Sequence, residues 1–99
     1  MIRGTTPTLE FTLPFDTILL AEAWVTLSQN GSEIVTKTLQ ECSCEGEMLT
    51  VRLAQEDTLK LRSDSNTEIQ IRARTHEGDA LASNIITAST ARILKDGVI

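Results

Sequence analysis

The feature that most constrains this chain is an alternation of polar and apolar residues with a period of two. Residues 68–74 alternate long polar side chains with Ile69, Ile71 and Ala73. Successive side chains of a strand point to opposite faces, so this pattern predicts a strand with one buried face and one outward face. The alternation recurs over residues 8–13, 21–28 and 48–53. The chain therefore favours a β fold.

Turn signals separate these segments. Asn30-Gly31 is the strongest short hairpin signal in the chain, and it predicts a partner strand over residues 33–39. Glu45-Gly46 predicts a second hairpin. Residues 77–79 are expected to turn the chain into a last strand over residues 81–88.

Residues 55–61 break the alternation with good helix formers, but they are too few for an independent helix. We expect one short helical turn across an end of the fold.

Six or seven short strands joined by tight turns predict an all-β, immunoglobulin-like antiparallel β-sandwich. No repeat or linker divides the 99 residues, so we expect a single domain over residues 1–99. The tail, residues 91–99, either caps this core or reaches a neighbouring subunit.

Composition limits the classes of partner that this chain can bind. The formal charge of −5 opposes binding to nucleic acid and to anionic membranes, because both attract clustered Lys and Arg. Residues 1–6 lead into alternating sequence, where a signal peptide would have a continuous apolar block. We therefore expect the protein to be cytoplasmic until assembly or lysis. With only 3% aromatic residues, its core should be built from aliphatic side chains.

No group of residues predicts catalysis. Cys42 and Cys44 form an isolated pair, and His76 is the single histidine, whereas a zinc site needs three or four ligands. Two reduced thiols at a strand edge explain the cysteines better than a disulfide does, because residues two apart on a strand suit its geometry poorly. The acidic turn at residues 64–68 lacks the glycine and the terminal glutamate of a calcium loop. We expect no cofactor, no metal and no enzymatic activity.

One predicted face offers candidate binding residues. Gln70, Arg72 and Arg74 take outward positions on their strand, and Arg52 takes one on another strand. Cross-strand charge pairing on a solvated face explains them, and so does a protein interface or a glycan-contact surface. Trp24 falls on the outward face of its own strand. It is either an exposed interface anchor or a side chain that strand twist or a register change buries.

Three segments carry a family resemblance: MIRGTTPT at residues 1–8, LAQEDTLKL at residues 53–61, and residues 68–99. Together they resemble short uncharacterised proteins encoded among the structural genes of phages and prophages of Gram-positive gut bacteria. They are more distantly similar to the N-terminal β domain of baseplate upper proteins in tailed phages. The resemblance implies a virion- or tail-associated β-sandwich, and it supplies no catalytic residues.

Two functional hypotheses follow. The first is a non-catalytic, phage- or prophage-derived structural or adaptor module, associated with a tail or baseplate. It would contact other virion or tail proteins, or itself as a homo-oligomer, through sheet edges and the face around Arg72 and Arg74. The alternative is a binding module for a cell-surface glycan or receptor, with Trp24 as a stacking platform.

Overall fold

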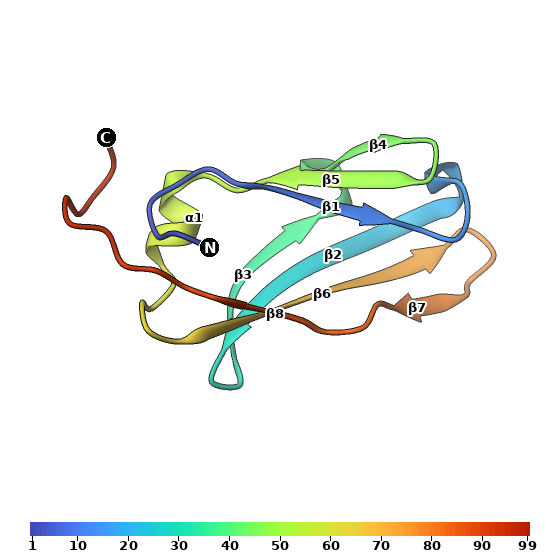
Figure 1. The fold of residues 1–99 in the computed structure, drawn as a ribbon. Coiled ribbons are helices and arrows are strands. Elements are labelled where there is room, and N and C mark those ends of the chain that lie inside the picture. The colour runs from blue at the N-terminus through green and yellow to red at the C-terminus, as the bar shows by residue number, and fades with distance from the viewer.

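The computed structural model describes residues 1–99, and its architecture is two antiparallel β-sheets with one short α-helix. The sheets form two layers (Figure 1). The three-stranded sheet has the order β1-β5-β4, with bounds Thr8–Thr12, Met48–Arg52 and Ser43–Glu45. The five-stranded sheet has the order β3-β2-β6, with both β7 and β8 on the free side of β6. Its bounds are Ser32–Thr38, Leu20–Gln29, Asn66–Thr75, Ala80–Ala82 and Ile86–Ser89.

The predicted turn between β2 and β3 is confirmed. Asn30 and Gly31 have φ values of 52° and 78°, so both lie in the left-handed region that a type I′ hairpin turn needs. The predicted hairpin around Glu45-Gly46 is also present, as the pairing of β4 with β5. These turns bring strands that are neighbours in the sequence side by side.

The core fills the space between the two sheets, and it is aliphatic as predicted. Its side chains come from alternating positions, because one face of each strand points inward. Phe11 is its single aromatic member. The buried hydrophobic residues are Phe11, Leu20, Ala23, Val25, Leu27, Val35, Leu49, Val51, Leu53, Leu61, Ile69, Ile71 and Ala73.

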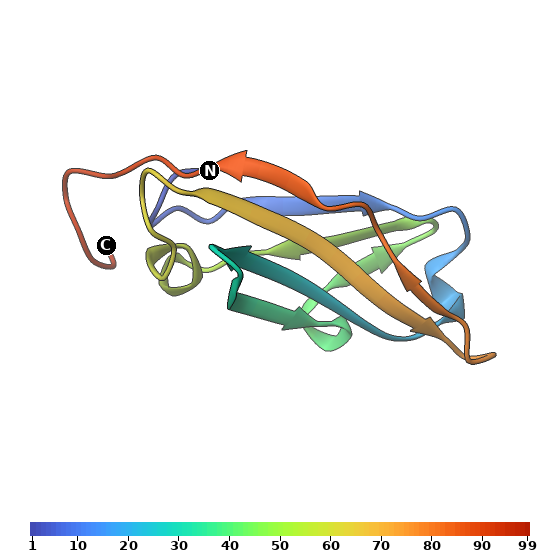
Figure 2. The same cartoon turned by 90° about the horizontal axis from the view of Figure 1, so that it is seen from below.

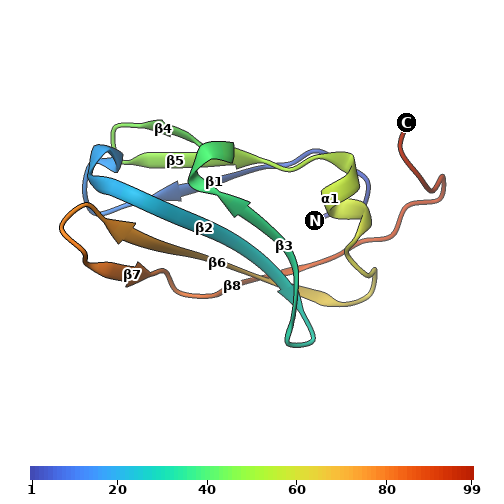
Figure 3. The ribbon, with the colours of Figure 1, turned by 180° about the vertical axis from the view of Figure 1, so that it is seen from behind.

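The predicted helical turn is α1, Gln55–Leu59, and it closes one end of the molecule (Figure 3). Leu53 and Leu61 flank it and are buried. Thr58 donates a hydrogen bond of 2.8 Å from its hydroxyl to the carbonyl of Thr5. Two short 3-10 turns, η1 at Thr17–Leu19 and η2 at Leu39–Glu41, complete the elements. No helix is long and apolar enough to span a membrane.

The single last strand predicted over residues 81–88 is wrong, because the structure has two short strands there and eight strands in all. Ala82 lies opposite Arg72 and Ile86 lies opposite Ile69, so β7 and β8 contain one residue more than β6 between these pairs. The backbone N–H of Ile71 donates to the Ser83 hydroxyl at 3.1 Å, where regular pairing would use a carbonyl. This local bulge splits the edge strand.

The C-terminal tail lies against the α1 end of its own chain (Figure 1). The Gln55 amide accepts from the backbone N–H of Ile99 at 2.8 Å and donates to its carbonyl at 3.2 Å. Ile93 is partly buried, whereas Leu94 and Ile99 are 91% and 89% exposed. The tail therefore adds one apolar side chain to the fold and leaves the others in solvent.

Candidate functional site

The outer face of the five-stranded sheet holds most of the candidate residues. Pairing of β2 with β6 places Trp24 opposite Arg72 and Glu22 opposite Arg74. Residues directly opposite each other in a sheet project from the same face. The chain neighbours of Trp24, Ala23 and Val25, are buried, so Trp24 points outward. Its residue surface is 38% exposed, so no strand twist or register change buries it.

A shallow hollow of about 480 Å³ lies on this face. It crosses β3, β2, β6 and β7, because long side chains rise around small ones in neighbouring strands. The long side chains of Trp24, Arg72 and Arg74 form its walls. The short side chains of Thr26, Thr36 and Ala80 lie between them. The full lining is Trp24, Thr26, Glu33, Thr36, Arg72, Ala73, Arg74 and Ala80.

The two arginines of the hollow differ in what they contact. Arg74 makes an ion pair of 3.3 Å with Glu22, and both side chains are about half exposed. Arg72 is exposed and makes no ion pair and no side-chain hydrogen bond, so the donors of its guanidinium face solvent. Because Arg72 is the cross-strand neighbour of Trp24, an aromatic surface and a free cation lie side by side.

The structure separates two other candidates from this hollow. Gln70 shares the outer face of β6, but its amide donates a 2.9 Å hydrogen bond to the carbonyl of Ser83 and so holds the β7–β8 connection. Arg52 belongs to the other sheet, where it donates to the Thr6 hydroxyl at 3.3 Å. Sequence reasoning missed Glu33 and Thr36, since a register shift after Leu27 decides which β3 side chains reach the hollow.

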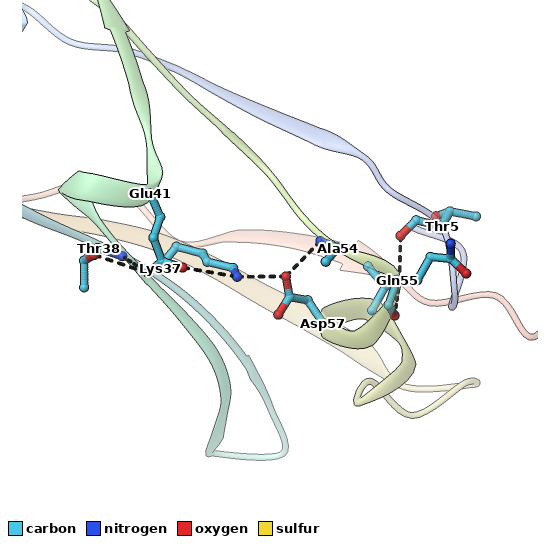
Figure 4. Close-up of polar contacts among 8 residues, drawn as sticks. Thr5, Lys37, Thr38, Glu41, Ala54, Gln55 and Asp57 are labelled. Atoms are coloured by element: carbon cyan, nitrogen blue, oxygen red, sulfur yellow. Dashed lines mark hydrogen bonds and ion pairs between the residues drawn. The ribbon is translucent and has the colours of Figure 1, made fainter. Parts of the chain in front are cut away.

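A second polar cluster, which the sequence did not indicate, joins β3 to α1 (Figure 4). Lys37 Nζ lies 2.9 Å from Asp57 Oδ2 and 3.4 Å from Glu41 Oε2. The Lys37 and Asp57 side chains are 16% and 10% exposed. Asp57 also accepts from the backbone N–H of Ala54 at 2.8 Å. The cluster ties α1 to β3, an edge strand of the five-stranded sheet.

Each charge in this cluster is stabilised by its neighbours. The hydrogen bond to Asp57 raises the pKa of Lys37 above its usual value, against the effect of burial. Burial alone would raise the pKa of Asp57, but hydrogen bonds from Lys37 and Ala54 outweigh it, and the pKa is lowered. The backbone N–H of Thr38 lowers the pKa of Glu41 in the same way. All three groups stay ionised near neutral pH, which suits a structural clamp.

The two cysteines are free thiols in different surroundings. Cys42 is partly buried, and its Sγ donates to the carbonyl of Thr38 at 3.3 Å. Burial raises the pKa of Cys42 to about 11, with smaller contributions from Cys44 and Glu41. Cys44 is exposed on β4. A thiol with so high a pKa is a poor nucleophile at neutral pH.

No group of three or more His, Cys, Asp or Glu side chains is placed to hold a metal ion. Comparison with known proteins found no matching family model, no matching curated protein and no matching solved structure.

Proposed function

We propose that this chain is a non-catalytic structural or adaptor module of phage or prophage origin, which docks to another virion or tail protein through the outer face of its five-stranded sheet. The observation that carries the proposal is the exposed Trp24 beside the unpaired guanidinium of Arg72 in an open hollow. The resemblance of residues 1–8, 53–61 and 68–99 to phage structural proteins supplies the setting.

Docking to a partner protein would stabilise such a pair of side chains. Tryptophan and arginine are the residue types enriched at the energetic centres of protein interfaces. Trp24 offers a large rigid apolar surface, and Arg72 offers several donors to a carboxylate or to backbone carbonyls. A partner that covers both removes apolar area from water and adds charge-assisted hydrogen bonds. The open hollow leaves both side chains accessible to such a partner.

The proposal includes an immunoglobulin-like sandwich. Its support is the strand order, since β1-β5-β4 opposite β3-β2-β6-β7 corresponds to strands B-E-D opposite C′-C-F-G. Strand A of such a sandwich has no full counterpart, and a short parallel bridge between Ile2 and Ala91 takes its place. This correspondence makes β6 the equivalent of the central F strand.

The alternative function is binding of a cell-surface glycan or receptor. The hollow supports it by its size, because about 480 Å³ falls in the range of small-ligand sites. It also places the hydroxyls of Thr26 and Thr36 and the carboxylate of Glu33 near an exposed indole. We rank it second because the hollow is open, whereas small-molecule sites enclose most of their ligand.

The test is incorporation of the chain into phage particles after prophage induction in a host that carries its gene. An antibody should detect the wild-type chain in purified particles. Arg72→Glu and Trp24→Ser should reduce incorporation at least about tenfold with unchanged melting temperature, while Arg62→Glu, at an exposed arginine on another surface, should not.

Particles that lack the wild-type chain would contradict the proposal, and so would equal incorporation of Arg72→Glu. Saturable quenching of Trp24 fluorescence by cell-wall polysaccharide fragments, lost in Trp24→Ser, would support the glycan alternative in its place.

A further inference from the structure

One sheet edge of this molecule differs from the others. The strand β6 pairs with β2 on one side and with β7 and β8 on the other, so the far side of β7 and β8 has no partner strand (Figure 2). Residues 80–91, which include this edge, contain no charged residue, no glycine and no proline, although 23% of the chain is charged. These are properties of a strand that can add another strand.

The remaining edges are protected in the usual way. Charged side chains discourage edge pairing because they resist close approach and desolvation. Each other edge strand has at least one: Glu10 in β1, Glu33 and Lys37 in β3, and Glu45 in β4. The edge formed by β7 and β8 is therefore the single unprotected one.

Backbone hydrogen bonds show which groups of this edge are free. The N–H of Thr90 donates to the carbonyl of Ser65 at 3.2 Å. By alternation, the backbone N–H and C=O groups of Ala88 and Ile86 also point toward β6, and those of Thr87 point away from it. Ser89 also faces away, but its carbonyl accepts from the amino group of Met1 at 2.7 Å. The N-terminus thus closes one end of the edge, and the stretch from residue 80 to residue 88 stays open.

Aliphatic side chains accompany the free backbone. Leu81, Ile85 and Ile86 are 41%, 55% and 53% exposed. Leu81 also lines an apolar groove of about 270 Å³ together with Leu13 and Phe15. The groove exists because the three-stranded sheet is narrower than the five-stranded one, so it does not cover the inner side of β7.

We propose that this edge pairs with the same edge of a second copy, antiparallel and about a two-fold axis. The net charge of −5 makes two copies repel, and the uncharged edge is where they can approach without burying a charge. A two-fold axis makes one surface complementary to itself, so Leu81, Ile85 and Ile86 of each copy cover those of the other. The two five-stranded sheets become one continuous sheet.

This dimer uses a different surface from the Trp24 face and does not depend on the function proposed above. Its axis is perpendicular to the sheet, so both Trp24–Arg72 hollows point to the same side. A partner with repeated docking segments would then bind two hollows at once, with a gain in avidity. The apolar area is small, so the dimer should have a dissociation constant on the order of micromolar.

The test is the solution mass of the full chain by light scattering and sedimentation over a wide range of concentration. Wild type should pass from monomer to dimer. Ile85→Lys should raise the dissociation constant at least about tenfold, because it places like charges near the axis. Met48→Lys is the matched control: Met48 is 42% exposed and lies in β5, the central strand of the other sheet, so this variant should dimerise like wild type.

Hydrogen exchange locates the contact. The amide of Thr87, which faces away from β6, should become protected as the concentration of wild type rises, and it should stay unprotected in Ile85→Lys. A monomer at every concentration would overturn the proposal and leave the edge to a strand of a different protein. A dimer that survives Ile85→Lys, or a trimer or hexamer, would also overturn it. Trp24→Ser should leave the dimer intact.

Discussion

At the scale of single residues, the Lys37–Asp57 pair connects parts of the chain that neither sheet joins by backbone pairing. Lys37 lies opposite Val25 in the sheet, so its side chain starts on the inner face and runs along the core before its ammonium group meets Asp57. The pair thus anchors the single helix to the edge strand β3.

This pair should make stability depend on pH. The pKa of Asp57 is lower in the folded chain than its usual value, so its stabilising effect is present above that usual value, near about 4, and is lost as the pH falls through the folded pKa. Asp57→Asn should lower the free energy of unfolding by about 1–3 kcal/mol at pH 7. Urea denaturation followed by circular dichroism between pH 7 and pH 3 measures both effects.

The same experiment contains its own control. Because the Asn variant has no carboxylate to protonate, its stability should change less than that of wild type over the acid range. Parallel curves for the two proteins would show that Asp57 is not the group responsible.

The two thiols should differ in reactivity. At pH 8 Cys42, with a pKa of about 11, is almost entirely protonated, and it is partly buried, whereas Cys44 is exposed. Iodoacetamide should therefore modify Cys44 first, and Cys44→Ser should remove the fast phase that Cys42→Ser retains. Mass spectrometry of timed samples follows the reaction, and equal rates in the two variants would contradict the assignment.

At the scale of elements, period-two alternation was sufficient to predict the two longest strands. Residues 21–28 and 68–74 were predicted as strands with the inward faces that they have in β2 and β6. The stretch over residues 81–88 was not resolved into two strands, because a side-chain hydroxyl, that of Ser83, interrupts its pairing. The Lys37–Asp57 contact was equally invisible, since it depends on how α1 crosses the sandwich end and not on spacing in the sequence.

The hollow was predicted in part for the same reason. Trp24, Arg72 and Arg74 share a face by alternation within two strands, and the sequence indicated that much. Which residues of β3 join them depends on a bulge in the pairing of β2 with β3. Local patterns determine the face of a strand, whereas register between strands determines the neighbours on it.

The β2–β3 turn offers a direct test of the hairpin. Gly31 has a φ of 78°, and an added Cβ would meet no atom within 4 Å, so Gly31→Ala changes only backbone strain. We expect a loss of about 1–2 kcal/mol and a melting temperature lower by roughly 4–8 °C per kcal/mol. Ser32→Ala, next to it at the start of β3, should melt close to wild type. An unchanged Gly31→Ala would mean that the turn relaxes to another type.

Removal of the tail tests its limited part in the fold. An added Cβ at Gly4 would lie 2.9 Å from Ile93 Cδ1 and 3.3 Å from Leu59 Cδ2, so Ile93 packs close to Gly4 and α1. Truncation after Arg92 should lower the free energy of unfolding by only about 1–2 kcal/mol. Leu27→Ala, in the fully buried core, should lower it by about 2–5 kcal/mol. Thermal melts compare the two, and loss of folding on truncation would contradict this account.

At the scale of the whole molecule, the elements form a flat, elongated body with extents of 46, 26 and 16 Å. One end of this body is closed by α1 and the tail, and the Lys37–Asp57 pair holds the edge strand β3 to α1. The outer face of the five-stranded sheet and its opposite edge, formed by β7 and β8, stay open. The open surfaces are those with exposed Trp24, free Arg72 and the uncharged strands β7 and β8. The two contacts proposed above therefore use separate surfaces, one face and one edge.

Hydroxyl-radical footprinting of Trp24, in the isolated chain and in purified phage particles, is the sharpest test of docking through the outer face of the five-stranded sheet. Trp24 is the single tryptophan, so its oxidation reports on the proposed docking face alone. We predict ready oxidation of Trp24 in the isolated chain and strong protection in the particle. Equal oxidation of Trp24 in both states would contradict docking through this face.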